Sequence, residues 1–333
     1  MPISFHIEYG SWYEMAVNSD KPHLWKEDVA KSVDHYNAWF MEFAPDAYRR
    51  TRAAASEVVE RTLYLTDYLM DVRPQILEKN PKCIKVLRMA TAPPIARDRL
   101  SGLAKIPRTM VEQMENQGRV PPKMNRDVLY EYLEKIGSLF EQLADRDLFI
   151  WLTDGREPTK DELARASIIV ADRLCGADTD PIIRNTQETR QLGVLRQWLG
   201  ARGYREINER NGLSIHGFEP GTFAVRFNTR AERDDGENIN IPIDIIIMPI
   251  KARHGSLPLM VEAKSAGDFT NVNKRRKEEG MKMRLLKETF GMDLQYILFL
   301  CGYFDTPYLG FEAAEGIDWV WEHRVEDLAK FGV

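Results

Sequence analysis

Two short apolar runs, residues 241–247 and 259–265, carry the most informative pattern of the chain. Each run has the length of a buried strand, and the first is rich in isoleucine. Side chains of a strand alternate between its two faces, so Glu262 and Lys264 of the second run share one face. The pattern predicts two neighbouring strands that carry charged side chains in an apolar setting.

The first part of the chain, to about residue 180, is typical of helices. Residues 128–143 repeat apolar side chains at three- and four-residue spacing, which predicts one amphipathic helix. Residues 94–117 favour two short helices, with Pro107 opening the second and Gly118 ending it. This pair is either a helix-turn-helix that contacts DNA or two helices that simply pack in the core.

After an expected loop at 176–181, the pattern alternates between helix and strand. The predicted order is helix, three strands, helix, two strands and a short terminal helix, at 186–200, 222–228, 241–247, 259–265, 271–290, 296–300, 317–321 and 325–331. We therefore expect two domains, a helical one over 1–180 and an α/β one over 181–333.

Composition narrows the class of protein. The chain has 333 residues, of which 44% are hydrophobic and 29% charged, as in ordinary soluble globular proteins. Its three cysteines form no pair or cluster with zinc-ligand spacing. We find no secretion signal and no apolar stretch of membrane-spanning length, so we expect a cytoplasmic protein.

Charge is unevenly distributed along the chain. The net charge is -5, which argues against indiscriminate coating of nucleic acid. Residues 251–290, however, hold ten basic and five acidic side chains, an excess of five positive charges. Basic residues directly after the second strand can bind phosphates, although a charge run is also typical of a solvated surface, and Glu278 with Glu279 indicates that part of this one is solvated.

The charged strand residues have the chemistry of a metal-dependent nuclease site. Asp244 and Glu262 supply the oxygen ligands that Mg²⁺ prefers, and Lys264 can orient a water molecule and stabilise negative charge. Glu188 lies four residues before Leu192 on the predicted helix and projects from its apolar face. It is either a further member of the site or a first-turn glutamate favoured by the helix dipole. The alternative for Glu262 and Lys264 is an ion pair on an edge strand.

The arrangement of Asp244, Glu262, Ala263 and Lys264 after a helix with Glu188 resembles the PD-(D/E)xK nuclease superfamily. Longer strings, at 92–100, 261–279, 302–305 and 310–319, resemble the XamI family of type II restriction endonucleases. One departure is that Pro242 stands two residues before Asp244 instead of directly before it. Since the acid performs the chemistry, the implied mechanism is hardly affected.

The resemblance implies an α/β fold with a restriction-endonuclease-like core, in which a mixed central sheet is flanked by helices, and a helical N-terminal domain that grips DNA or dimerises. It implies a Mg²⁺-dependent homodimer that cleaves a short palindromic site in double-stranded DNA, leaves a 5′-phosphate and a 3′-hydroxyl, and is paired with a DNA methyltransferase. Candidate DNA contacts are Ser265, Asn271, Asn273, Lys274, Arg275, Arg276, Lys277, Arg97, Arg99 and Arg108.

Three other functions stay open at this point. A repair or recombination nuclease would use the same chemistry but read DNA structure instead of sequence. A DNA-binding regulator would use residues 94–117 and keep an inert nuclease core. An intracellular structural protein, in which Glu262 and Lys264 merely pair, would have no affinity for DNA.

Overall fold

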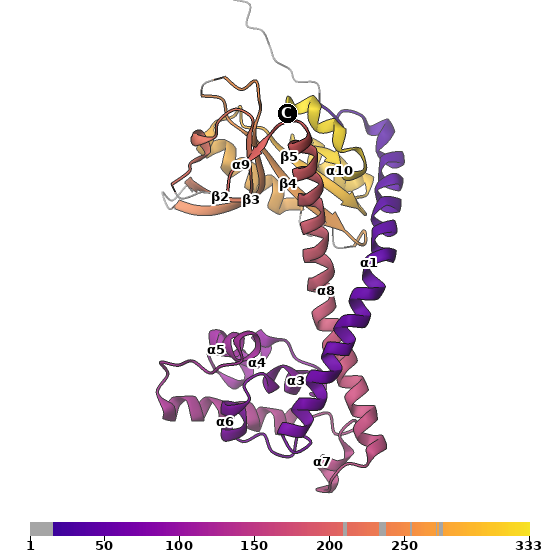
Figure 1. Cartoon of the computed structure of the whole chain (residues 1–333), viewed down its shortest axis with the longest axis vertical. Helices are drawn as coiled ribbons and strands as arrows, with labels where there is room; N and C mark the ends of the chain where they lie inside the picture. Colours follow the sequence, from indigo (N-terminus) through magenta and orange to yellow (C-terminus); the bar gives the residue numbers. More distant parts are fainter. Residues whose placement is uncertain (1–15, 209–211, 233–237, 254, 271, 273–275) are drawn as a thin grey trace, which may run out of the picture. The chain divides into compact units, whose positions relative to one another are not determined.

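A computed structural model describes residues 16–208, 212–232, 238–253, 255–270, 272 and 276–333. The chain divides into two compact units, with boundaries between Glu42 and Phe43 and between Ile183 and Arg184. We call the unit of residues 43–183 the helical unit and the rest the sheet unit (Figure 1). Helices α1 (Pro22–Leu65) and α8 (Lys160–Ala201) contribute residues to both.

The division differs from the expected one at its N-terminal side, because residues up to Glu42 group with the sheet. Two hydrogen bonds show the reason. The backbone amide of Gly302 donates to the Ser32 hydroxyl at 2.8 Å, and the Asn18 side chain donates to the backbone oxygen of Trp319 at 2.7 Å. The start of α1 is therefore part of the sheet unit.

The loop expected at 176–181 is wrong, because these residues lie within α8, Pro181 included. Leu174 and Cys175 are buried in the core of the helical unit, and the Thr179 hydroxyl donates to the backbone oxygen of Cys175 at 2.7 Å. This packing holds the helix through a sequence whose local preference is for a turn.

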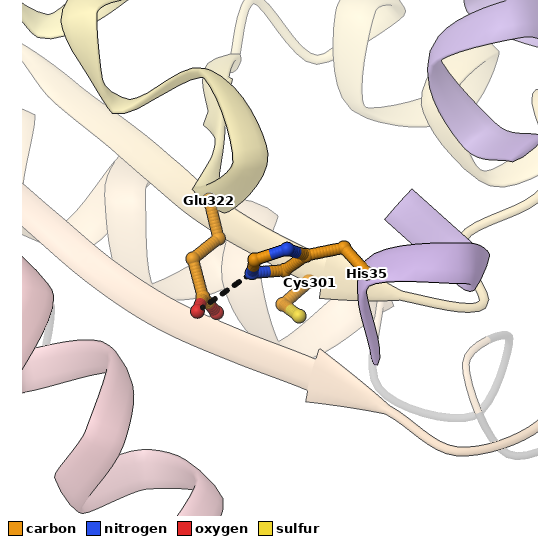
Figure 2. A group of neighbouring side chains, drawn as sticks. All are labelled: His35, Cys301 and Glu322. Carbon is orange, nitrogen blue, oxygen red and sulfur yellow. Dashed lines mark hydrogen bonds and ion pairs between the residues drawn. The ribbon is translucent and has the colours of Figure 1, made fainter. Parts of the chain in front are cut away.

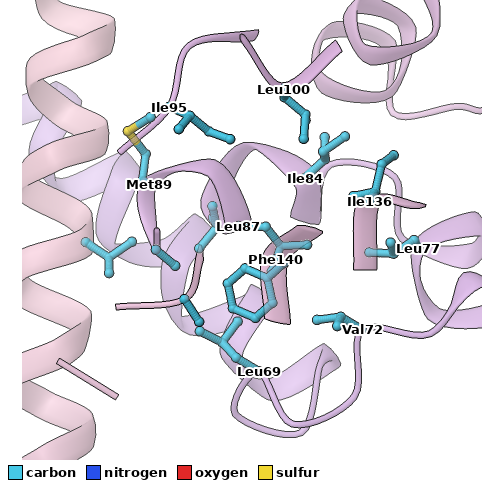
Figure 3. Close-up of a cluster of buried hydrophobic side chains, with 14 of the residues drawn as sticks. Leu69, Val72, Leu77, Ile84, Leu87, Met89, Ile95, Leu100, Ile136 and Phe140 are labelled. Atoms are coloured by element: carbon cyan, nitrogen blue, oxygen red, sulfur yellow. The ribbon is translucent and has the colours of Figure 1, made fainter. Parts of the chain in front are cut away.

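The helical unit contains six further helices around one apolar core. They are α2 (Pro74–Lys79), α3 (Cys83–Met89), α4 (Arg97–Ala104), α5 (Arg108–Glu112), α6 (Arg126–Leu143) and α7 (Ile150–Asp154), with a π-helix at Gln113–Gln117. The amphipathic helix expected at 128–143 is confirmed as α6, whose Ile136 and Phe140 enter the core shown in Figure 3. The two short helices expected around Pro107 are confirmed as α4 and α5.

The sheet unit is built on a mixed sheet of six strands in the described part of the chain. Its strands, in spatial order, are β1 (Arg205–Glu206), β2 (Thr222–Glu232), β3 (Asn238–Met248), β4 (Leu259–Ala266), β5 (Tyr296–Gly302) and β6 (Asp318–Trp321). Strands β2, β3 and β4 pair antiparallel, whereas β1 with β2, β4 with β5 and β5 with β6 pair parallel.

Helices cover both faces of the sheet, which agrees with the expected mixed sheet flanked by helices. On one face, Leu192, Leu195 and Leu199 of α8 form the α8-side core with the sheet. On the other, α9 (Arg276–Phe290) and α10 (Thr306–Ala314) form the α9-side core. The chain ends in a 3-10 segment, Glu322–Phe331, where a short helix was expected. No helix in the described ranges is long and apolar enough to cross a membrane.

The regular alternation of side chains along β2 and β3 is interrupted at one point. Val225 and its partner Ile245 belong to the α8-side core, whereas Phe227 and its partner Ile243 belong to the α9-side core. Residues two apart on a regular strand would share a face. Arg226 and Asp244 lie between these pairs and are not paired in the register, and Arg226 has a φ of 52°, which is uncommon for a residue other than glycine.

Candidate active site

Three of the residues predicted for the site come together on β3 and β4. Glu262 and Lys264 share the α9 side of the sheet, as the alternation predicted, since they pair in register with Leu298 and Leu300 of the α9-side core. Asp244 reaches them from β3, where its Oδ2 accepts a hydrogen bond from the backbone amide of Ala263 at 2.9 Å. Glu262 is only 8% exposed, so the edge-strand ion pair does not describe it.

Helix α9 adds two residues that the sequence analysis did not select. The Lys264 ammonium lies 3.1 Å from Oε1 of Glu262 and 2.7 Å from Oε1 of Glu279. The ammonium of Lys282 lies 2.6 Å from Oε2 of Glu262. Both carboxylate oxygens of Glu262 therefore have a lysine partner, and each lysine comes from a different element.

The expectation that Glu279 is solvated is wrong, because this residue is only 3% exposed, whereas Glu278 is exposed as expected. Its Oε2 accepts a hydrogen bond from the Tyr296 hydroxyl at 2.8 Å, which fixes the carboxylate beneath α9. The sequence did hold a signal, since Glu279 stands four residues before Met283 and seven before Leu286, both of which are buried.

Helix α8 supports the strands from the other side through Gln191, which is 1% exposed. Its side-chain amide donates to the backbone oxygens of Lys264 at 3.3 Å and Phe299 at 3.2 Å. This contact fixes the backbone of β4 at the catalytic candidate and was not foreseen from the sequence.

The electrostatics of the group are dominated by burial and by crowding of carboxylates. Burial first, and then the negative charge of Glu262, raise the pKa of Asp244 to about 6. Burial opposes the charged form of Lys264, but Glu262 and Glu279 outweigh it and raise the pKa of the ammonium above its usual value. Lys264 therefore stays protonated at neutral pH.

This donor set suits a hard divalent cation. Asp244 and Glu262 offer carboxylate oxygens on adjacent strands, and their mutual repulsion is the kind that a bound cation relieves. When all are ionised, the three carboxylates and two lysines of the group keep one excess negative charge. A divalent cation would reverse that excess and prepare the group for a phosphate.

Glu188 lies on α8 and forms an ion pair with Arg226 at 2.9 Å, with 39% of the Glu188 side chain exposed. The two neighbours of Arg226 on β2 pair with Ile245 and Ile243, the two neighbours of Asp244 on β3. Glu188 thus reaches the neighbourhood of the site through Arg226, and its role in catalysis stays a prediction.

A second cluster, of His35, Cys301 and Glu322, brings three potential metal-ligand atoms within 4.8 Å of one another (Figure 2). The guanidinium of Arg190 already contacts all three, at 2.6 Å from Glu322, 3.4 Å from Cys301 and 3.5 Å from His35. Burial raises the pKa of the Cys301 thiol, which disfavours the thiolate that a metal needs. We assign the cluster as an anchor for Arg190, which holds α8 against the sheet one residue before Gln191.

The family model described as XamI restriction endonuclease matches residues 67–321. The chain belongs to this family. It is also 48% identical to the type II restriction enzyme SalI of Streptomyces albus G over 318 residues, which cover 95% of this chain and 99% of the relative. No solved structure matches significantly. The predicted family, its α/β fold class and its function as a type II site-specific deoxyribonuclease are confirmed. Double-stranded DNA is therefore the substrate, and type II restriction enzymes in general use a divalent metal ion.

Most of the predicted DNA contacts of this XamI family member lie at the end of β4 and after it. Ser265 is half-buried at the end of β4, close to Lys264. Arg276 and Lys277 begin α9, but their side chains lie outside the described part. The other candidates after β4, which are Asn271, Asn273, Lys274 and Arg275, lie outside the described residues.

In the helical unit, the three predicted arginines lie on α4 and α5. Arg97 is 3.5 Å from the buried Glu115, and Arg108 is 3.1 Å from Asp98. Arg99 is exposed. These ion pairs favour neither DNA contact nor simple helix packing, so both alternatives stay open.

Proposed function

We propose that the protein cleaves DNA as a Mg²⁺-dependent homodimer. Asp244 and Glu262 are the metal ligands, and Lys264 stabilises the negative charge that develops in the reaction. The observation that carries this proposal is the convergence of two carboxylates and a protonated lysine on β3 and β4. A bound Mg²⁺ supplies charge neutralisation at the scissile phosphate and a water molecule of lowered pKa.

The protein's own groups have separable tasks in the reaction. The oxygen of the attacking water bonds to phosphorus and one of its protons passes to solvent. The bond from phosphorus to the 3′ oxygen breaks, that oxygen takes a proton from water, and a 5′-phosphate and a 3′-hydroxyl result. Lys264 stays protonated, so it acts by donating hydrogen bonds to developing negative charge and not as the base. Glu279 and Gln191 hold Lys264 in place from the side chain and the backbone respectively.

The proposed partners are a second copy of the chain, the DNA and a methyltransferase. A homodimer matches a two-fold DNA site, since the two active sites then cut symmetry-related strands. Ser265 and the basic residues at the start of α9 would contact the DNA beside the scissile phosphate, and Arg97, Arg99 and Arg108 would contact it from the helical unit. A methyltransferase that protects the same sequence is the expected partner in the cell. Glu188 would support Asp244 through Arg226.

The test is incubation of the purified protein with plasmid and phage DNA, with Mg²⁺ and with EDTA, alongside Glu262→Ala. We expect discrete fragments that require Mg²⁺ and disappear in the variant, while DNA binding is retained, because Glu262 acts mainly on the transition state. Glu288→Ala, an exposed glutamate on α9, is the matched control and should cut like the wild type.

The remaining outcomes separate the alternatives. A smear or structure-dependent cutting would contradict cleavage at one specific sequence. Cleavage that persists in Glu262→Ala would show that Glu262 is not part of the active site. Equal activity in EDTA would show that cleavage does not require a metal ion.

A further inference from the structure

The two lysines on Glu262 are held unequally. Lys264 has a second carboxylate partner, Glu279, at 2.7 Å. Glu279 is itself fixed by the Tyr296 hydroxyl at 2.8 Å. Among the described residues, Lys282 has Glu262 as its one ion-pair partner, at 2.6 Å, and its side chain is 16% exposed. One lysine is therefore anchored independently of Glu262, and the other is not.

This asymmetry determines how the two lysines would respond if Glu262 coordinated a cation. Lys264 retains Glu279 and stays where it is. Lys282 is left as a largely buried ammonium without its carboxylate, which is costly unless another anion takes its place. The anion that arrives at this point during the reaction is the scissile phosphate.

Helix α9 places Lys282 firmly enough for such a role. Lys282 and Glu279 are three residues apart, so they project from neighbouring positions of one helical face. Met283 and Leu286 of the same helix are buried in the α9-side core. One rigid helix thus carries both the movable ammonium and the carboxylate that holds Lys264.

We propose that Lys282 is a further catalytic residue, whose ammonium leaves Glu262 and donates a hydrogen bond to a non-bridging oxygen of the scissile phosphate. This inference rests on the proposed function of Asp244 and Glu262 as metal ligands. Lys282 thereby adds a second ammonium to that of Lys264 in stabilising the negative charge that develops in the reaction.

The experiment is single-turnover cleavage, across a Mg²⁺ titration, of a plasmid that the wild type cuts, together with DNA binding measured in EDTA. For Lys282→Met we expect the rate at saturating Mg²⁺ to fall roughly 100-fold or more, as for loss of a group that stabilises transition-state charge. The Mg²⁺ concentration for half-maximal rate should not rise, because a cation that competes for Glu262 has been removed. Lys282→Arg, which keeps the charge, should recover part of the rate.

The controls separate this role from a structural one. Lys287→Met, on the same helix, should cut at the wild-type rate. If Lys282 only neutralises Glu262 in the metal-free protein, Lys282→Met will reach a rate within about threefold of the wild type at high Mg²⁺, and the proposal is overturned. Should Lys282→Met fail to bind DNA, Lys282→Gln provides the same test with a donor to Glu262 retained. A wild type that leaves all DNA intact would instead refute the proposed function itself.

Discussion

The buried carboxyl group of Glu312 on α10 makes stability depend on pH in a way that one substitution can isolate. Glu312 is 0% exposed, and its carboxyl group lies beside the Tyr308 hydroxyl. Burial raises its pKa from 4.5 to about 7. Each pKa unit corresponds to about 1.4 kcal/mol, so the shift amounts to about 3 kcal/mol.

The sign follows from which state binds the proton more tightly. Between pH 4.5 and about 7 the folded protein keeps a proton on Glu312 that the unfolded chain has released. Folding stability therefore falls as pH rises through this window, and the loss is nearly complete above it. Glu312→Gln resembles the protonated acid at every pH, so it removes this dependence.

The assay is urea unfolding of wild type and Glu312→Gln at about pH 5 and about pH 8. We expect the free energy of unfolding of the variant, relative to wild type, to rise by roughly 2–3 kcal/mol between these conditions. A constant offset from the amide itself would not matter, because only the change with pH is compared. Glu288→Gln, at an exposed position, should show no such change. A difference between wild type and Glu312→Gln that stays the same at both pH values would refute the reasoning.

Two further predictions concern the supports of the site. Gly302→Ala should destabilise the sheet unit strongly in thermal unfolding, because Gly302 has a φ of 100° and an added Cβ would lie 2.1 Å from the backbone oxygen of Ala266; a wild-type melting temperature would contradict this. Arg190→Met should cost about 3–5 kcal/mol in urea unfolding, since it leaves the buried Glu322 without its cation, and Glu322→Gln in the same background should restore part of the loss.

Local pattern was sufficient for the strands of the site. Alternation placed Glu262 and Lys264 on one face, and the register of β4 with β5 agrees. Strings of specific residues were sufficient for the family, which the match over residues 67–321 confirms. Both kinds of inference succeed because they depend on positions close together in the chain.

Contacts between elements that are distant in the chain could not be predicted from local sequence patterns. Glu279 next to Glu278 was taken as solvated, although its spacing from Met283 and Leu286 put it on the buried face of α9. A buried carboxylate is tolerated only with partners, and these are Lys264 and Tyr296 on β4 and β5. The continuity of α8 through Pro181 likewise depends on packing that a turn-forming local sequence does not reveal.

The change of faces at Arg226 and Asp244 connects the remaining prediction, Glu188, to the site. Simple alternation along β3 would give all its isoleucines two fixed faces, but Ile243 and Ile245 enter different cores. A positive φ at an arginine costs of order 1–3 kcal/mol and persists only where the surroundings enforce it. Two contacts can hold this conformation. One is the ion pair of Arg226 with Glu188, and the other is the hydrogen bond from the backbone amide of Ala263 to Asp244. Since such strain gathers at functional sites, we infer that Glu188 contributes by holding the bend that presents Asp244 beside Glu262.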